Sequence, residues 1–212
     1  KLLRQSFPSL TSLHSLLKIL TQFRICRPFL NYQFNISLYD RKQIIEIGRD
    51  SIGQYTHGFH LLNLKHLGLQ ILYAVLNALP GVAAERCFAP WPDRERQLRD
   101  HHLPLTSLES ARPMVAFDII GFSLQYELSY TNMLNMMDMG GIPLRSDDRL
   151  ESHPLIIAGG PCTFNPVPLN SFIDAFVIGE GEEVVAEITA AVSAAKKQAL
   201  TRKTIIEKLA EI

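Results

Sequence analysis

The chain has 212 residues, of which 47% are hydrophobic and 20% are charged, a composition typical of a globular protein. Its 21 Lys and Arg residues balance 21 Asp and Glu residues, so no net field favours nucleic acid or a membrane as a partner. No apolar run reaches the ~18 residues of a membrane span. Cys26, Cys87 and Cys162 are too far apart for a zinc or iron–sulfur motif, and we expect a cytoplasmic protein with reduced thiols.

The first 65 residues differ from the rest of the chain. They carry nine Lys or Arg residues but three Asp or Glu residues, and the leucines between Leu10 and Leu20 follow the spacing of an amphipathic helix. We assign residues 1–65 to an atypical, partly helical N-terminal extension, which is either an ordinary extension or an aberrant, non-native terminus. The alternative is a transit peptide, since the segment is rich in Arg and Ser and begins without acidic residues.

From residue 66 onward, apolar strands alternate with amphipathic helices of 12 to 18 residues. The expected helices are 66–79, 90–102, 128–141, 182–199 and 201–212. The expected strands are 81–90, 104–108, 117–124, 154–160 and 173–181. Such alternation predicts an α/β fold with a Rossmann-like (flavodoxin-like) parallel sheet and helices on both faces.

Three consecutive strands end in small or polar residues. Ser123 ends one, Gly159-Gly160 ends the next, and residues 179–181 follow the third. Ligands of parallel sheets bind beyond the carboxyl ends of the strands, and glycines there let a planar group approach the backbone. The alternative is that tight turns after strands simply favour glycine.

Three further features each have two interpretations. Glu183 suits the first turn of a helix, but a carboxylate there also suits acid–base or metal chemistry. Cys162 is either an incidental small residue or a reactive thiol in a loop. The four methionines within residues 133–139 are either adaptable core packing or a surface for a cofactor. We favour the helix turn, the incidental cysteine and core packing.

Three segments form a specific combined pattern: "FDIIGFSLQYELSYTNMLNMMDMGGIPLRS", "PLIIAGGPCTFNPVPL" and "DAFVIGEGEE". Together they resemble the N-terminal cobalamin-binding-type (B12-binding) domain of cobalamin-dependent radical S-adenosylmethionine (SAM) proteins, in an uncharacterised bacterial subfamily. The segments "HLGLQILYAVLNALPGVAAERCFAPWP" and "LPLTSLES" fit the same group. The resemblance covers about residues 66–212.

The resemblance implies a cobalamin-binding-like α/β domain at residues 66–195 and a helical linker at 196–212. The linker would lead to a radical SAM domain in cis, which holds a [4Fe–4S] cluster and S-adenosylmethionine through a CxxxCxxC motif that this sequence lacks. We therefore expect a truncated part of a radical SAM enzyme that is inactive alone. We assign it no catalytic residue, no metal ligand, and no nucleic acid or membrane partner.

The resemblance also implies a cobalamin site. Ser123, followed by Leu124, takes the place of the serine that faces the nucleotide tail. Gly159 and Gly160, followed by Pro161, would let the tail enter between the sheet and a helix. A loop would close the site, and its residues are Gly179, Glu180, Gly181 and Glu182. In the parent enzyme the domain would present the corrinoid over the radical site.

Several features of cobalamin domains are missing. Domains that ligate cobalt carry Asp-x-His-x-x-Gly, whereas His66 lacks the Asp and His102 lacks the Gly. The sequence "SLQ" at 123–125 replaces the usual Ser-x-Leu, and 59–64 is only a candidate substitute for the first strand. The rival interpretation is therefore a cofactor-free scaffold or interaction domain that shapes substrate access to the radical SAM barrel. A nucleotide-binding Rossmann domain is less favoured, because G-x-G-x-x-G is absent.

Overall fold

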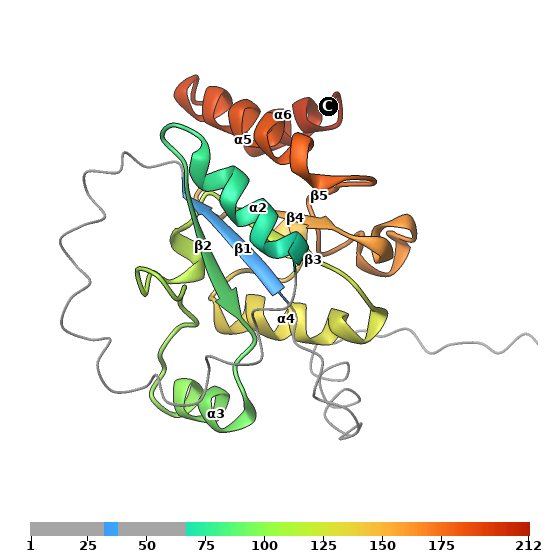
Figure 1. Cartoon of the computed structure of the whole chain (residues 1–212). Helices are drawn as coiled ribbons and strands as arrows, with labels where there is room; N and C mark the ends of the chain where they lie inside the picture. The colour runs from blue at the N-terminus through green and yellow to red at the C-terminus, as the bar shows by residue number, and fades with distance from the viewer. Residues whose placement is uncertain (1–31, 38–66) are drawn as a thin grey trace, which may run out of the picture. The chain divides into compact units, whose positions relative to one another are not determined.

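The computed structural model describes residues 32–37 and 67–212 (Figure 1). The helix expected around residues 10–20 and the substitute strand expected at 59–64 lie outside the described residues. None of the helices in the described part is long and apolar enough to cross a bilayer.

A five-stranded sheet in the order β2-β1-β3-β4-β5 forms the centre of the domain. Strands β3, β4 and β5 are parallel, and β1 pairs antiparallel with both β2 and β3, so β2 points the same way as β3. The bounds are Tyr32–Ser37 for β1, Ala83–Phe88 for β2, Ile119–Ser123 for β3, Leu155–Gly159 for β4 and Ala175–Phe176 for β5. The predicted α/β class is confirmed.

Strand β1 is the departure from the expected all-parallel sheet. It belongs to the segment assigned to the N-terminal extension, yet it lies between β2 and β3, with Tyr32 opposite Ser123. Its sequence YQFNIS alternates apolar and polar residues, the period-two signal of a strand, which the helical interpretation of this segment missed. Because β1 is antiparallel, its first residue lies at the carboxyl edge of β3.

Helices cover both faces of the sheet (Figure 1). They are α2 (Leu67–Ala78), α3 (Pro92–Asp100), α4 (Tyr130–Met139), α5 (Gly181–Lys197) and α6 (Arg202–Leu209). Successive strand residues face opposite sides, so Ile119 and Ile157 pack with α2, α5 and α6, whereas Ile120 and Phe122 pack with α4. Residues of odd number in β3 and β4 therefore share the face of α2 and α5.

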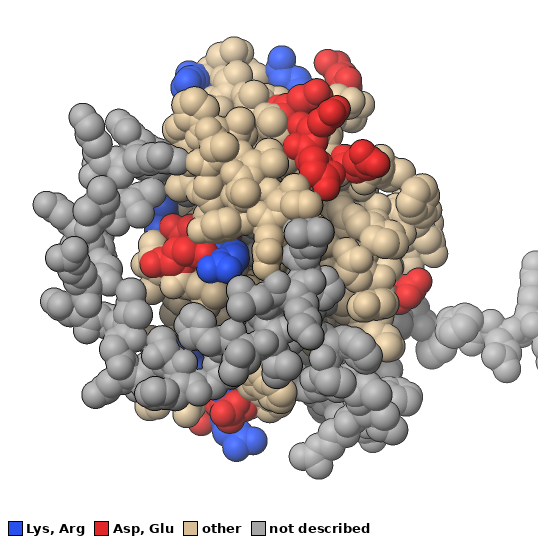
Figure 2. Space-filling model, viewed as in Figure 1, with Lys and Arg blue, Asp and Glu red and all other residues tan. Residues whose placement is uncertain are grey.

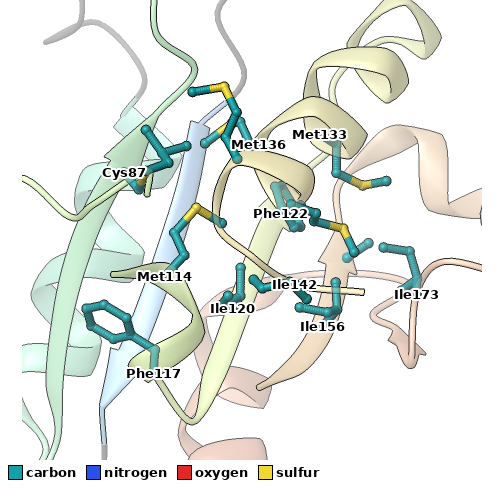
Figure 3. Close-up of a cluster of buried hydrophobic side chains, with 14 of the residues drawn as sticks. Cys87, Met114, Phe117, Ile120, Phe122, Met133, Met136, Ile142, Ile156 and Ile173 are labelled. Carbon is teal, nitrogen blue, oxygen red and sulfur yellow. The ribbon is translucent and has the colours of Figure 1, made fainter. Parts of the chain in front are cut away.

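The core on the α4 side contains the methionines (Figure 3). The four in α4 are all buried, and Met114 from a preceding short 3₁₀ turn joins them. The interpretation of these residues as core packing is thus confirmed.

All five expected strands are shorter than predicted, two of them markedly. Residues 104–108 contribute an isolated bridge between Thr106 and Pro113. Strand β5 spans two residues of the expected 173–181, and the chain turns into α5 after Gly179, whose φ is 124°.

Candidate functional site

A groove of about 310 Å³ lies between α2, α5 and the carboxyl edge of β3 and β4. Its walls are mostly aliphatic side chains and glycines. The lining residues are Gly68, Leu69, Leu72, Leu76, Ile119, Gly121, Phe122, Ser123, Gln125, Ile157, Gly159, Gly160, Val177, Gly179, Gly181, Glu182, Val185 and Ile188. A small aromatic group fits this volume, which is at the lower end of the range for ligand pockets.

Ser123 and Gly159 form the floor of this groove. They are direct partners in the parallel ladder between β3 and β4, and both face α2 and α5 because they are odd-numbered. Val177 lies on the far side of Gly159, since its amide donates to the Ala158 carbonyl oxygen at 2.8 Å. The floor thus presents one hydroxyl beside one strand position without a side chain.

Six of the predicted site residues line the groove: Ser123, Gly159, Gly160, Gly179, Gly181 and Glu182. The other three do not. Leu124 is 1% exposed and packs into the core on the α4 side, because the residue after Ser123 points to the opposite face of the sheet. Pro161 begins a 3₁₀ turn, and Glu180 is the exposed residue that precedes α5.

Gly160 is a glycine because the fold requires one. Its φ is 102°, and a Cβ there would lie 2.9 Å from the Leu124 carbonyl oxygen. The same carbonyl accepts the Cys162 amide at 3.2 Å, so the loops after β3 and β4 are joined at this point. Thr163 is 1% exposed, and its Oγ1 lies 2.7 Å from the Gly160 oxygen and 3.0 Å from the Val177 oxygen. The tight-turn interpretation therefore accounts for Gly160.

Gly159 is different, because neither its backbone conformation nor its packing requires glycine. A Cβ at this position would meet its nearest neighbour, the Val177 Cβ, at an ordinary 3.9 Å. Among the described residues, a Cβ on Gly68, in the first turn of α2, would meet no neighbouring atom within 4 Å. These two glycines keep the sheet wall and a helix wall of the groove free of side chains.

Two further glycines of the groove, Gly179 and Gly181, shape its walls. Gly179 has a φ of 124°, which favours glycine. A Cβ on Gly181 would lie 3.3 Å from Leu72 Cδ2, so this glycine permits the close approach of α5 to α2.

Gln125 is a groove residue that the sequence analysis did not assign. Its Nε2 donates a hydrogen bond to Ser123 Oγ at 2.8 Å. Both side chains are half-buried and line the groove. The signal that could have identified Gln125 was its place in "SLQ", where an amide replaces the usual leucine.

The groove carries little charge. Glu182 is its one titratable lining residue among those described, and it belongs with Glu183 to the first turn of α5. In Figure 2, acidic side chains gather on the side of the molecule where α5 lies. Within the described residues, no three His, Cys, Asp or Glu side chains come together as a metal site. His102 lies in the turn after α3, with a φ of 52°, and does not line the groove.

Cys162 lies beyond Gly160 and packs against the core on the α4 side rather than in the groove. Burial raises the pKa of its thiol above the ordinary value, and a hydrogen bond from Tyr130 opposes this shift. A raised pKa keeps the thiol protonated near neutral pH, so its environment does not favour a reactive thiolate.

A second cavity of about 310 Å³ lies at the opposite, amino edge of the strands. It is lined by Asp118, Glu151, His153, Leu155, Lys196, Ala199, Leu200, Thr201, Arg202 and Ile205. Behind it, the side chain of Asp174 is 1% exposed, and its Oδ2 pairs with Arg149 at 3.0 Å and with Arg202 at 2.5 Å. The same oxygen accepts the Ile156 amide at 2.7 Å, so one carboxylate joins β4, α6 and the loop before β4.

Comparison with known proteins identifies the family. The family model for the N-terminal domain of radical SAM proteins matches residues 68–212, more than half of the chain. No curated protein and no solved structure matches the chain significantly. The match includes α2, the strands from β2 to β5 and the whole groove, but not β1. The radical SAM part of the resemblance is thus confirmed, and the partner of such a domain is a radical SAM domain of the same polypeptide. The chain belongs to the family of radical SAM protein N-terminal domains.

Proposed function

We propose that this domain holds the nucleotide tail of a corrinoid in the groove between α2, α5 and the sheet, and presents the corrinoid to the radical SAM domain. The observation that carries the proposal is Gly159, a strand position without a side chain that neither φ nor packing requires. A bare position beside Ser123 is what a flat ring needs to lie against the sheet.

The groove residues fit such a group in shape and in polarity. The aliphatic side chains of Leu72, Val185 and Ile188 offer apolar walls to an aromatic base. Ser123 offers the hydroxyl that would fix the orientation of the base. When bound, a corrinoid supplies organometallic chemistry such as methyl transfer, whereas this chain binds and orients it.

The rim around the groove suits a large apolar partner. Large hydrophobic side chains are exposed in the loops that follow β3, β4 and β5: Tyr126, Leu128, Phe164, Val167 and Ile178. Their exposed fractions run from 52% to 76%. Concentrated apolar exposure of this kind is typical of an interaction surface. We infer that the radical SAM domain or the corrin ring covers this rim.

The test is retention of cobalamin by the purified 212-residue chain. Hydroxocobalamin is added, the protein is desalted, and the corrinoid absorption spectrum is recorded. We expect retention by the wild type, and binding at least about tenfold weaker for Gly159→Leu, whose side chain fills the floor of the groove. Cobinamide, which lacks the nucleotide tail, serves as the ligand control and should not be retained.

The second candidate is a cofactor-free scaffold, which the exposed apolar rim also favours. A scaffold would retain neither corrinoid but would bind a separately produced radical SAM domain of the same family. Replacing Phe164 and Val167 by Ser should then weaken that complex, because both side chains are more than 70% exposed. Equal retention of cobalamin by wild type and Gly159→Leu would contradict the groove as the site.

A further inference from the structure

The hydrogen bond between Gln125 and Ser123 determines which hydrogen-bonding function of the Ser123 hydroxyl is left for a ligand. A serine hydroxyl has one proton to donate and two lone pairs that accept. The Gln125 amide is the donor in this pair, at 2.8 Å, so it occupies a lone pair of Ser123 Oγ. Among the described residues, no other hydrogen bond of the Ser123 hydroxyl is found, and its proton remains available.

Both side chains of this pair face the groove. Ser123 and Gln125 both line the groove, and the strand floor beside them is the bare Gly159. Residue 124 between them points to the opposite face, so the two polar side chains share one side of the chain. Gln125 Nε2 is also close to Gly160, since a Cβ there would lie 3.3 Å from it. The Gln125 side chain is thus held between Ser123 and the loop after β4.

We propose that Gln125 is a positioning residue that makes Ser123 a hydrogen-bond donor, so that the groove selects planar ligands that present an acceptor atom. This inference rests on the proposed function, because it concerns the group that the groove holds. A ligand that only donates leaves the Ser123 proton unpaired in an apolar site, and an unpaired buried polar group is unfavourable. A ligand with a ring nitrogen lone pair accepts that proton.

Three bicyclic probes of similar size distinguish these cases. 1-Methylbenzimidazole only accepts a hydrogen bond through its ring, indole only donates one, and 1-methylindole does neither. Binding to the 212-residue chain is followed by NMR chemical-shift changes on titration. For the wild type we expect 1-methylbenzimidazole to bind roughly three- to tenfold more tightly than indole, which corresponds to one hydrogen bond.

Two substitutions separate positioning from a structural role. In Gln125→Glu the carboxylate takes the Ser123 proton, so only lone pairs face the groove, and the order of the two probes should reverse. In Gln125→Leu the hydroxyl is free to rotate, and the two probes should bind within about twofold of each other. The Ser123→Ala variant is the control, and it should bind all three probes alike.

The outcomes separate the two proposals. If wild type binds the probes without preference, or if Gln125→Glu keeps the wild-type order, the role of Gln125 is overturned while the groove stands as a site. If no probe binds the wild type and cobalamin is not retained, the proposed function fails, and the inference fails with it.

Discussion

A cavity of about 310 Å³ lies at each of the two edges of the parallel strands. The cavity at the amino edge is lined largely by charged and polar residues, whereas the one at the carboxyl edge is lined mainly by apolar residues. At the amino edge, half of the lining residues are titratable, and their charges are used by the fold. Lys196 pairs with Asp118, Glu151 accepts the Arg202 amide at 2.6 Å, and Arg202 pairs with Asp174. At the carboxyl edge, glycines and aliphatic side chains surround one hydroxyl and one amide, with the single carboxylate of Glu182 among the lining residues.

This difference indicates that the amino-edge cavity contributes to the stability of the fold, whereas the carboxyl-edge groove is the candidate ligand site. The amino-edge charges are paired in contacts that hold α6 and the loops to the sheet, although Arg202 Nε and Asp174 Oδ1 are buried without a hydrogen-bond partner among the described residues. At the carboxyl edge, the absence of a side chain at Gly159 and Gly68 is not explained by backbone or packing. An unexplained absence beside a polar floor is a stronger pointer to a ligand than a charged cavity whose charges are already paired.

The largest expected effect is on stability at the amino edge. Replacing Asp174 by Asn leaves Arg149, 0% exposed at its side chain, and Arg202 without their buried counter-charge. Burial lowers the pKa of the Arg149 guanidinium, and Asp174 opposes that shift, so the carboxylate favours the charged form of the buried guanidinium. We expect a loss of about 3–5 kcal/mol in the free energy of unfolding, measured with urea.

Asp118→Asn is the matched control for this experiment. It breaks the pair with Lys196, whose side chain is 40% exposed, and should cost less than about 1 kcal/mol. Losses of similar size in the two variants would show that the Asp174 network is not the main electrostatic support of the amino edge.

The next effect compares two adjacent glycines at the carboxyl edge. Gly160→Ala forces an alanine to a φ of 102° and places its Cβ against the Leu124 carbonyl, so we expect a loss of about 1–3 kcal/mol in stability. Gly159→Ala should change stability by less than about 0.5 kcal/mol, because its Cβ meets only ordinary contacts. Urea unfolding measures both, and the reverse order would remove the distinction on which the groove proposal depends.

Much of this fold is readable from the sequence because its strong signals are local. The apolar runs at 117–124 and 154–160 predict strands buried on both faces, and Pro80-Gly81 marks the end of α2. The predicted extent of β5 is too long because apolar residues continue at Val177 and Ile178, past the end of the strand at Phe176. Strand β1 carries a weaker alternating signal inside a segment that otherwise predicts helix.

The site could be predicted only in part. It depends on which residues of a strand face the same side of the sheet, and on segments that lie far apart in the sequence. Ser123 and Gly159 were identified from the ends of their strands, and their shared face follows from period two once the register is known. Leu124 follows Ser123 directly, so its side chain points to the opposite face of the sheet and does not line the groove. Gly68 comes from a helix more than 50 residues earlier, and no local pattern relates it to Ser123.

The smallest expected effect concerns Cys162, and it tests whether the reactive part of the carboxyl edge extends beyond the groove. Cys162 follows the groove glycines closely in sequence, but it packs on the α4 side and has a raised pKa because of burial. A raised pKa means that less thiolate is present at neutral pH, so iodoacetamide should label Cys162 slowly at about pH 7.5 and faster as the pH rises above about 9. Labelling is measured by mass spectrometry in a Cys26→Ser background, with the fully buried Cys87 as the internal control.

The Tyr130→Phe variant extends this test, because the hydrogen bond between Tyr130 and Cys162 determines in which direction the labelling rate should change. The Tyr130 hydroxyl stabilises the Cys162 thiolate and lowers its pKa, so its removal should raise the pKa further and slow labelling severalfold at about pH 7.5. The two rates should converge at a pH high enough to ionise both thiols. Rapid labelling of the wild type at neutral pH would instead place a reactive thiolate at this edge. Chemically active side chains at the carboxyl edge would then extend from the groove, through the loop after β4, to the α4 side of the sheet.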